Sequence, residues 1–560
     1  MLDRAMRLNE DALAVCVAVL LACMVLFQPV FLGTYVTNVD HITQLRWSIQ
    51  FAEVLGNGST LPRWAPAAHG NLGEPSFLYY QPLFFYCSAL LANLLGSVQR
   101  GMELSLLFSN AAVGWVAYAW LRNDLGGKKA VAVGSLLQLL PTLLFLHAVY
   151  GAYPWVFSAP FALAFALESS RVSPRWRVIA ISLGFCVLAH VLSAFMVLVL
   201  AGVFVVRRWA LEILSQNQSR DSFRSVARWL LGVLVGLALA SFYLLPAMTL
   251  QSWANPQGWV EDPTLDWHRA FILPTFTRVQ FGYRWFLLQV PLPALALLMA
   301  LAGWWLARGR TGSLAGLVRS LAVLAALGLV LGSELAYPLY EASASLQRLQ
   351  WPYRFMVPAI MLAAMAYLVG MTAWWSALAW GVRRLCLALP LLAMLALHVA
   401  LQIIIHRDQR PAPTPDKAMS GVFGQPEYQT ASRGPQWRDY LEQGGFAAEC
   451  ARREVTCREA AVSGNDWTAL LTVPDSAAIT QLVLPRFAFP TWAISINGQF
   501  QTWTIDQATG LIQVNLSPGT WRLAVRWKPS TEEHAGLLIS LFAAAMLLPI
   551  GRLSRGASER

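Results

Sequence analysis

Long apolar runs, separated by short polar segments, recur along the whole of this 560-residue chain. A bilayer's hydrocarbon core takes about 20 apolar residues per helix, so the pattern predicts about twelve transmembrane helices. The first run is too long for a signal-peptide core and is expected to remain as an anchor. The expected helices cover about residues 12–33, 102–121, 130–149, 155–170, 177–190, 192–206, 229–249, 286–306, 314–332, 353–378, 385–404 and 535–551.

Two apolar stretches do not fit a single crossing. Residues 177–206 are too long for one helix and short for two. We split them at His190, because Arg177 and Arg207 at the two ends both favour the cytoplasm. The segment Pro82–Gly96 is apolar enough to span, but a crossing there would put Arg122 on the outside. We therefore place this segment along the outer interface.

The positions of the charges give the chain a direction in the membrane. Only 13% of its residues are charged and 57% are hydrophobic, whereas soluble proteins average about 25% charged residues. The net charge of +11 comes from short basic clusters between apolar runs, which is the positive-inside pattern and argues against a nucleic-acid partner. Both termini are then expected in the cytoplasm. The cytoplasmic turns would hold Arg122, Lys128 and Lys129; Arg171, Arg175 and Arg177; Arg207, Arg208, Arg220, Arg224 and Arg228; Arg308 and Arg310; Arg383 and Arg384; and Arg552 and Arg555.

The outward-facing segments are the long ones, and the last of them changes character. It is polar and punctuated by Pro and Gly, with short alternating runs that predict strands and an Asn-Gly hairpin turn. We expect a small extracytoplasmic β-sandwich at 405–534, between a transmembrane domain at 1–404 and a last helix with a cytoplasmic tail at 535–560. The expected strands are Ile479–Leu484, Trp492–Ile496, Leu511–Leu516 and Trp521–Trp527.

Cysteine placement predicts a disulfide in this outer domain. Of the seven cysteines, Cys450 and Cys457 are the two that fall within 405–534. On the oxidising side of the membrane, we expect these two cysteines to form a disulfide bond. A metal site would need further ligands that the segment does not offer, and we expect no structural metal.

The first outer loop, residues 34–101, begins with an acidic residue followed by a helical pattern. Ile42, Leu45, Ile49, Ala52 and Leu55 form one stripe, which predicts an amphipathic helix over about 41–56 at the membrane surface. Asp40 falls at its N-cap. Helix capping alone explains an aspartate at this position, so a functional role needs further support.

That support comes from the order of motifs along the chain. It resembles the GT-C superfamily of membrane glycosyltransferases, and more closely the bacterial membrane proteins labelled "6-pyruvoyl-tetrahydropterin synthase-related" and their YfhO-type relatives. The label is a name, and nothing in the sequence suggests a pterin enzyme. The matching pieces are Asp40–Trp47, Leu61-Pro62-Arg63-Trp64, Gly70-x-x-Gly73-x-Pro75, Tyr79-Tyr80-x-Pro82-Leu83, Leu349–Phe355, and Leu484-Pro485-Arg486-Phe487-x-x-Pro490-x-Trp492 with Asn497-Gly498.

The resemblance implies a glycosyltransferase that takes its sugar from a polyprenyl-phosphate donor at the outer face of a bacterial inner membrane. The acceptor would be a glycan, a lipid or a protein. A general base is required near the acceptor hydroxyl, and Asp40 is the candidate. Leaving phosphate requires cations, and Arg348 and Arg354 lie on the same side as Asp40; headgroup snorkelling also explains both arginines. The remaining candidate substrate-binding residues are His41, Glu74, Tyr79, Tyr80 and His190.

The chain departs from the family's pattern at two places. Relatives often carry an Arg-Gly pair and an acid where this chain reads Tyr150-Gly151-Ala152-Tyr153-Pro154. Many GT-C enzymes have a second acid beside the first, where this chain has His41, and Glu74 is a later acid of the loop that could correspond to it. A structural role for His190 is as well supported as a functional one. These departures affect the expected chemistry more than the expected fold.

Two other functional classes compete with this hypothesis. A non-catalytic membrane subunit of a polysaccharide assembly or export machine would keep the same fold, with protein partners. A transporter is disfavoured, because the helices are nearly free of charge and the polar groups gather at the outer surface. No Walker loop, Rossmann glycine pattern or nucleophile elbow occurs. No cofactor is expected, although a divalent cation at Asp40 stays open because some GT-C enzymes use one.

Overall fold

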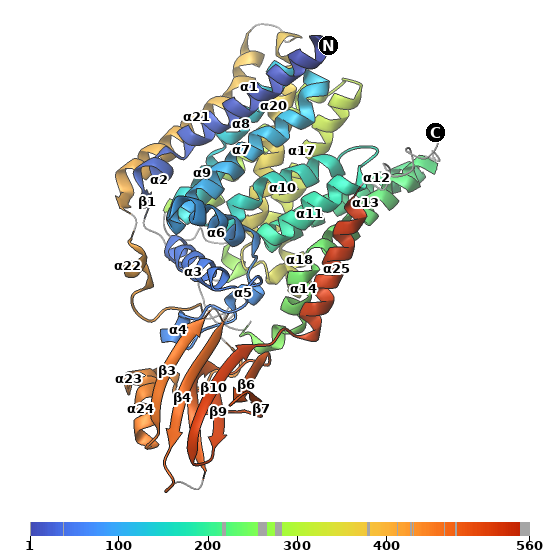
Figure 1. Cartoon of the computed structure of the whole chain (residues 1–560). Helices are drawn as coiled ribbons and strands as arrows, with labels where there is room; N and C mark the ends of the chain where they lie inside the picture. Colours follow the sequence, from blue (N-terminus) through green and yellow to red (C-terminus); the bar gives the residue numbers. More distant parts are fainter. Residues whose placement is uncertain are drawn as a thin grey trace.

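A slanted bundle of helices forms most of the protein, and a β-rich domain extends from one end of it (Figure 1). The computed structural model describes residues 2–36, 39–214, 220–255, 266–274, 283–377, 381–411, 413–425, 428, 430–463, 465–476 and 479–548. Each expected apolar run coincides with helical structure. The helices concerned are α1 (Leu2–Val25), α2 (Phe27–Leu32), α7 (Val98–Leu125), α8 (Gly127–Gln138), α9 (Pro141–Leu144), η1 (Phe145–Tyr150), α10 (Tyr153–Ser169), α11 (Trp176–Ala189), α12 (Val191–Leu214), α13 (Arg220–Leu239), α14 (Ser241–Thr249), α15 (Tyr283–Gln289), α16 (Pro291–Ala307), α17 (Ser313–Gly332), η7 (Pro352–Phe355), α20 (Met356–Trp374), α21 (Val382–Asp408) and α25 (Thr531–Leu547).

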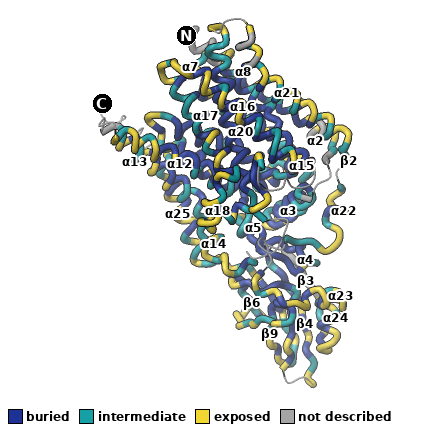
Figure 2. Tube along the Cα trace, turned by 180° about the vertical axis from the view of Figure 1, so that it is seen from behind, coloured by how far each residue is buried: buried dark blue, intermediate teal, exposed yellow. Residues whose placement is uncertain are grey.

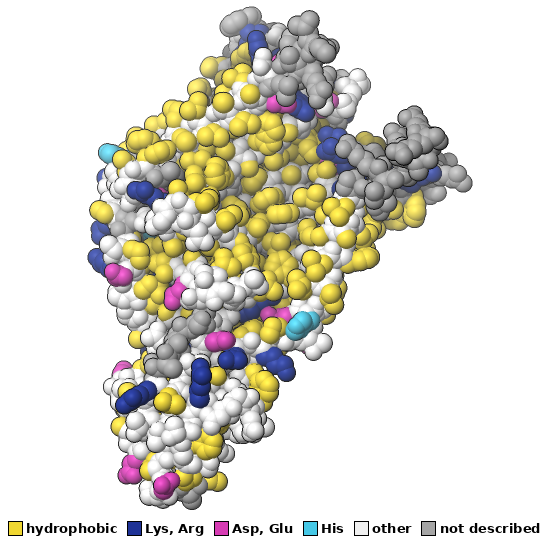
Figure 3. Space-filling model, in the orientation of Figure 1, with side chains coloured by type: hydrophobic (Ala, Val, Ile, Leu, Met, Phe, Trp, Pro, Cys, Tyr) yellow, Lys and Arg dark blue, Asp and Glu magenta, His cyan; other side chains and the backbone are white. Residues whose placement is uncertain are grey.

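The exterior of the bundle has the character of a lipid-facing surface. Among the described residues, eight helical segments are long and apolar enough to cross a membrane. Large apolar side chains cover the bundle's outer face (Figure 3), and Leu94, Leu234 and Phe542 are each well over half exposed. Such a surface would be an aggregation hazard in water and is stable in hydrocarbon. The chain is therefore a multi-pass membrane protein, while the count of twelve crossings stays a prediction.

The core of the bundle lies around α20. Every residue of Met356–Gly370 is buried, and Figure 2 shows this helix enclosed by its neighbours. Glycines on the surrounding helices allow close approach: a Cβ at Gly303 would lie 3.0 Å from the backbone of Ala366, and one at Gly328 would lie 2.9 Å from the Cβ of Ala359. Small residues at helix contacts are the usual means of packing in membranes.

The predicted break at His190 is confirmed. His190 adopts an extended conformation between α11 and α12, and the two helices fold back to the same end. There Arg208 of α12 donates a 2.7 Å hydrogen bond to the carbonyl of Arg171, just before α11. The basic residues at both ends of this stretch therefore lie on one side, as the charge pattern predicted.

Other basic turns gather at this end as well. Arg122 pairs with Asp11, and Arg171 lies 4.1 Å from the ring centroid of Trp120. Arg310 and Arg384 contact the neighbouring rings of Trp374 and Trp375. The predicted turn residues Arg552 and Arg555, and the side chains of Arg220 and Arg383, lie outside the described residues.

The first outer loop folds into a layer between the bundle and the β-rich domain. It contains α3 (Val39–Gly56), α4 (Ala68–Asn71), α5 (Ser76–Tyr79) and α6 (Leu83–Leu95). The 13 residues of α6 span about 20 Å, well short of the ~30 Å hydrocarbon core. This length fits the predicted place of the segment along the interface.

The helix predicted over about 41–56 is confirmed as α3, Val39–Gly56, but it is more enclosed by protein than the stripe indicated. Ile42, Ile49, Ala52 and Leu55 are half-buried, and the fully buried face carries polar residues as well. That face consists of His41, Gln44, Leu45, Trp47, Ser48, Gln50, Phe51 and Val54. The prediction assumed a helix lying on a flat membrane surface. Instead protein encloses α3: the Trp47 ring contacts Phe85, and Arg46 donates a 2.6 Å hydrogen bond to the carbonyl of Ala418.

The β-rich domain consists of two antiparallel sheets that share one buried core. Trp467, Leu482, Leu511 and Leu523 belong to that core. The four predicted strands are all present, and four additional ones complete the sheets. The sheets have the strand orders β3-β4-β10-β6-β7 and β5-β9-β8, with β3 at Thr456–Ser463, β4 at Asp466–Val473, β5 at Thr480–Phe487, β6 at Trp492–Ile496, β7 at Gln499–Gln501, β8 at Thr504–Ile505, β9 at Leu511–Leu516 and β10 at Gly519–Trp527.

A disulfide joins α24 (Gly445–Arg452) to β3 in this domain. It links Cys450 and Cys457, seven residues apart, and closes a short loop. We expect replacement of both cysteines by alanine to lower the domain's free energy of unfolding by about 2–3 kcal/mol, because the unfolded chain regains the entropy of that loop. Thermal unfolding with and without dithiothreitol checks this. The reductant should lower the melting temperature of the native protein and leave that of the double variant unchanged.

Candidate functional site

Asp40 lies in the first turn of α3, at the point where the first outer loop leaves the bundle. The strand β1 (Thr34–Val36) precedes it and pairs with β2 (Gln409–Pro411), which follows α21. This pairing fixes the start of α3 against the bundle. The helix begins at Val39, so Asp40 is its second residue and the predicted N-cap placement is wrong by two positions. A carboxylate there is still favoured by the helix dipole.

Two tyrosine hydroxyls lie near both Asp40 and Arg354. The hydroxyls of Tyr150, at the end of η1, and Tyr353, in η7, lie 3.3 Å apart. Both the Asp40 carboxylate and the Arg354 guanidinium act electrostatically on each hydroxyl. The structure therefore places the carboxylate and one of the two arginines that the sequence nominated near the same two hydroxyls. We call Asp40, Tyr150, Tyr353 and Arg354 the Asp40 cluster.

Arg354 is buried and incompletely satisfied. Nη1 donates to the carbonyl of Leu349 at 2.7 Å, and Nη2 donates to Oε1 of Gln350 at 2.9 Å. Its Nε has no hydrogen-bond partner within the described part of the chain. The guanidinium lies 4.5 Å from the ring centroid of Trp351. Burying a cation with one donor unpaired costs free energy.

Arg348 is placed differently from Arg354. Its side chain is exposed, one turn before the buried segment that carries Arg354. An exposed Arg348 fits the alternative interpretation, in which this side chain contacts lipid headgroups. Of the two predicted cations, the structure places one inside the cluster and one at its surface.

His190 borders the same cluster from the break between α11 and α12. Its ring stacks on Trp155 at a centroid distance of 5.5 Å, and Arg354 lies 5.9 Å from the Trp155 ring. The backbone N–H of Ser193 donates to Nδ1 of His190 at 3.2 Å. Because Nδ1 accepts this hydrogen bond, the neutral ring carries its proton on Nε2. His190 thus has a structural partner in Ser193, and its Nε2 is the remaining donor of the ring.

Two residues that the sequence did not nominate, Tyr153 and His147, extend the cluster. His41 Nδ1 forms a short hydrogen bond with the Tyr153 hydroxyl, and the His147 ring lies 5.5 Å from that of Tyr153. Burial lowers the pKa of His41 to about 4, so His41 is neutral at pH 7. The sequence signal for these residues was weak, because a lone histidine in an apolar run most often has a structural role.

Glu74 belongs to a largely buried network. Its carboxylate accepts from the Ser76 hydroxyl and from the backbone N–H of Gln425 at 3.1 Å, and it contacts Nε2 of His69 at 3.0 Å. These contacts hold the first loop to the segment that follows α22 (Pro415–Met419), and Gln425 also donates to the Thr43 hydroxyl of α3 at 3.0 Å. With its oxygens engaged in this way, Glu74 has protein partners that account for its burial.

Tyr79 and Tyr80 also have protein partners. The Tyr79 hydroxyl donates to the carbonyl of Leu250 at 2.6 Å, and burial raises the Tyr79 pKa well above its ordinary value. Gln44 donates to the Tyr80 hydroxyl at 3.2 Å, and the Tyr80 ring contacts Trp47. Tyr79 therefore ties the loop to the segment after α14, while Tyr80 faces α3.

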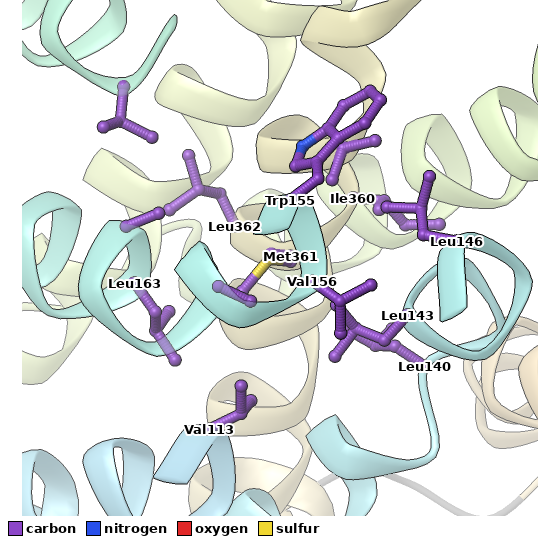
Figure 4. Close-up of a cluster of buried hydrophobic side chains, with 14 of the residues drawn as sticks. Val113, Leu140, Leu143, Leu146, Trp155, Val156, Leu163, Ile360, Met361 and Leu362 are labelled. Carbon is purple, nitrogen blue, oxygen red and sulfur yellow. The ribbon is translucent and has the colours of Figure 1, made fainter. Parts of the chain in front are cut away.

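The bundle beneath the cluster is closely packed. Leu143, Leu146, Trp155, Val156 and Met361 converge there from different helices (Figure 4). A cavity of about 20 Å³ beside Trp155 and Ser193 has room for about one water molecule. Within the described residues, no three His, Cys, Asp or Glu side chains are grouped so that they could hold a metal ion.

Comparisons with known proteins found only distant likenesses. No family model matches the chain, and no curated protein matches it. Among solved structures, it is similar to the mycobacterial arabinofuranosyltransferase AftD (18% identity, TM-score 0.42, 72% of this chain and 28% of that chain). It is also similar to the *Archaeoglobus fulgidus* oligosaccharyltransferase (15%, 0.36, 80% and 59%) and to ArnT from *Cupriavidus metallidurans* bound to undecaprenyl phosphate (15%, 0.30, 63% and 77%).

The chain thus spans well under two thirds of the length of the first two of these proteins. Identities and TM-scores at this level assign neither a family nor an activity. What the chain does is inferred from its own residues.

Proposed function

We propose that this protein is an inverting glycosyltransferase that uses a polyprenyl-phosphate-linked sugar at the outer face of a bacterial inner membrane. The proposal includes twelve crossings with both termini in the cytoplasm, and a β-sandwich on the outer side. A membrane lipid supplies the donor, and a glycan, lipid or protein supplies the acceptor. The proposal requires no cofactor; a divalent cation at Asp40 stays open.

Asp40 and Arg354 have complementary roles in this reaction. The acceptor hydroxyl oxygen attacks the anomeric carbon while the bond from that carbon to the phosphate oxygen breaks. Asp40 takes the hydroxyl proton as general base. The polyprenyl phosphate leaves with the bonding electron pair, and Arg354 binds the negative charge that develops on it. Attack opposite the leaving group inverts the configuration of the sugar.

One observation carries the proposal: the Arg354 guanidinium is buried and its Nε has no hydrogen-bond partner within the described residues, next to Tyr353, whose hydroxyl lies 3.3 Å from that of Tyr150. Structural roles alone account poorly for this arrangement. Asp40 would need only a helix start, and Arg354 would be more stable at the surface, as Arg348 is. Burying a guanidinium costs free energy that an anionic ligand recovers.

A second candidate is a non-catalytic membrane subunit of a polysaccharide assembly or export machine. The close packing beneath Trp155 favours it, since the cavity of about 20 Å³ is far smaller than the ~300–1,000 Å³ of ligand sites. Under the enzymatic proposal, lipid entry has to move side chains or helices there. Donor binding separates the two candidates.

Binding of undecaprenyl phosphate to the full chain in nanodiscs tests the role of Arg354. We expect Arg354→Gln to weaken binding by about 10–100-fold, because a charge-assisted hydrogen bond contributes about 1.5–3 kcal/mol. Arg348→Gln is the matched control, with an expected change below about threefold because the Arg348 side chain is solvent-exposed. Native mass spectrometry gives the affinity, and thermal unfolding checks that both variants fold. Equal affinity of native protein and Arg354→Gln contradicts the proposal.

A further inference from the structure

One edge of the Arg354 guanidinium is only half occupied. Nε and Nη2 lie side by side on this edge, and an arginine binds an oxyanion there through two parallel hydrogen bonds. Nη2 of Arg354 donates to Oε1 of Gln350 at 2.9 Å, whereas Nε has no hydrogen-bond partner in the described part of the chain. A single oxygen therefore stands where two donors are available.

A glutamine side chain does not fill this edge. Its amide has one acceptor oxygen, and the nitrogen beside that oxygen is itself a donor. A phosphate offers two oxygens side by side and a negative charge, which match the two donors and the cation. Nη1 of Arg354 already donates to the carbonyl of Leu349 at 2.7 Å, which leaves the edge of Nε and Nη2 for a ligand. An oxyanion completes the set of contacts that Gln350 leaves incomplete.

The backbone of Gln350 is strained. Its φ is 63°, in the left-handed region that residues other than glycine rarely adopt. Such a conformation persists only where neighbouring contacts hold it. Two contacts do so here: the backbone N–H of Gln350 donates to the carbonyl of Gln347 at 2.9 Å, and the side chain accepts from Arg354. Release of the side chain removes one of these contacts, so the strain favours release.

Gln350 belongs to the outer layer of the bundle. The short helix α19 (Ala344–Gln347) precedes it, and Ser345 and Arg348 of this segment are exposed. Gln350 itself is half-buried, whereas Arg354 is buried. The amide can therefore turn toward solvent while the buried helix α20, which follows Arg354, stays in place. Gln350 is thus one of the side chains whose movement admits a ligand to Arg354.

We propose that Gln350 is an internal competitor of the donor phosphate: its amide occupies the Nε and Nη2 edge of Arg354 in the free protein, and the phosphate of a polyprenyl lipid displaces it. This inference rests on the proposed function, which makes Arg354 the phosphate-binding residue. After displacement, Nε and Nη2 both donate to phosphate oxygens and the amide faces solvent. Gln350 lowers the affinity for the donor, and a lipid without a phosphate has no group that displaces it.

Two substitutions of Gln350 should change phosphate binding in opposite directions. Gln350→Ala removes the competing amide, so affinity for undecaprenyl phosphate should rise by about 3–10-fold. Gln350→Glu adds a second oxygen and a negative charge that fill the edge, so affinity should fall at least about tenfold. A glutamine that only positions Arg354 predicts weaker binding in Gln350→Ala. Gln347→Ala is the matched control: this amide donates to the carbonyl of Tyr340 at 2.8 Å, and its loss should change affinity by less than about twofold.

Native mass spectrometry of the full chain in nanodiscs gives the affinities, and thermal unfolding checks that each variant folds. Undecaprenol, which has no phosphate, is the comparison ligand, and the Gln350 variants should not change its binding. The inference is overturned if Gln350→Ala binds undecaprenyl phosphate no more tightly than the native protein, or if Gln350→Glu binds it as tightly. Weaker binding by Arg354→Gln without a gain in Gln350→Ala contradicts the competitor role alone. Unchanged binding by Arg354→Gln contradicts the proposed function, and absence of binding in every variant contradicts both.

Discussion

Asp40→Asn should lower the turnover number for sugar transfer by about 10²–10⁴-fold, the usual contribution of a general base. Asparagine has nearly the same size and still suits the start of a helix, so the fold and donor binding should remain. What it loses is the ability to accept the acceptor's proton. The neighbouring His41 does not replace this function, because it already binds Tyr153 and burial keeps its pKa at about 4.

The measurement uses purified protein in nanodiscs with undecaprenyl-phosphoryl pentoses and hexoses, and follows release of undecaprenyl phosphate. Glu53→Gln is the matched control, since Glu53 is an exposed carboxylate on the same helix. Its turnover number should stay within about twofold of the native value. Full activity of Asp40→Asn would exclude Asp40 as the base. Donor binding without transfer by the native protein, with any donor and acceptor, would favour the non-catalytic subunit.

The fold was predictable from the sequence to the extent that it depends on local patterns. Apolar length located the helices, and alternation with turn residues located four strands of the β-rich domain. Even the break at His190 followed from two arginine clusters that favour the same side of a membrane. Which residues of α3 are buried was not predictable, because the interpretation of the apolar stripe assumed that one side of the helix faces water. Phe85 and Ala418, which contact α3, come from segments about 40 and 370 residues away.

The candidate site was predictable only in part, for the same reason. The sequence nominated Asp40, His190 and Arg354 separately, from a helix start, a helix break and a family motif. Their convergence depends on three separate parts of the bundle. Tyr150, whose hydroxyl is near both Asp40 and Arg354, is an aromatic residue in an apolar run and carries no local signal.

The first loop is attached to the last helix by an ion pair that is nearly inaccessible to solvent. Nε of Arg63 donates to Oε1 of Glu533 at 2.8 Å, and both side chains are at most 4% exposed. Nη2 of Arg63 also donates to the carbonyl of Phe242 at 2.7 Å. Arg63 belongs to the Leu-Pro-Arg-Trp motif of the loop, which the family resemblance included without a stated role. The structure gives it one: it joins the loop, α14 and α25.

Glu533→Gln should therefore lower the free energy of unfolding by about 3–5 kcal/mol, because it leaves the Arg63 cation buried without a counter-charge. Glutamine retains the acceptor that caps α25, so loss of the cap does not explain the effect. Arg407→Gln is the control: its pair with Asp408 is mostly exposed, and such pairs contribute about 0–1 kcal/mol. Denaturant titration in detergent micelles gives both values.

The double variant Arg63→Met/Glu533→Gln identifies the cause. With the arginine gone, no buried cation remains, so the double variant should be more stable than Glu533→Gln alone, as seen when a buried pair is replaced by an uncharged one. Additive losses would mean that the two residues stabilise the protein independently.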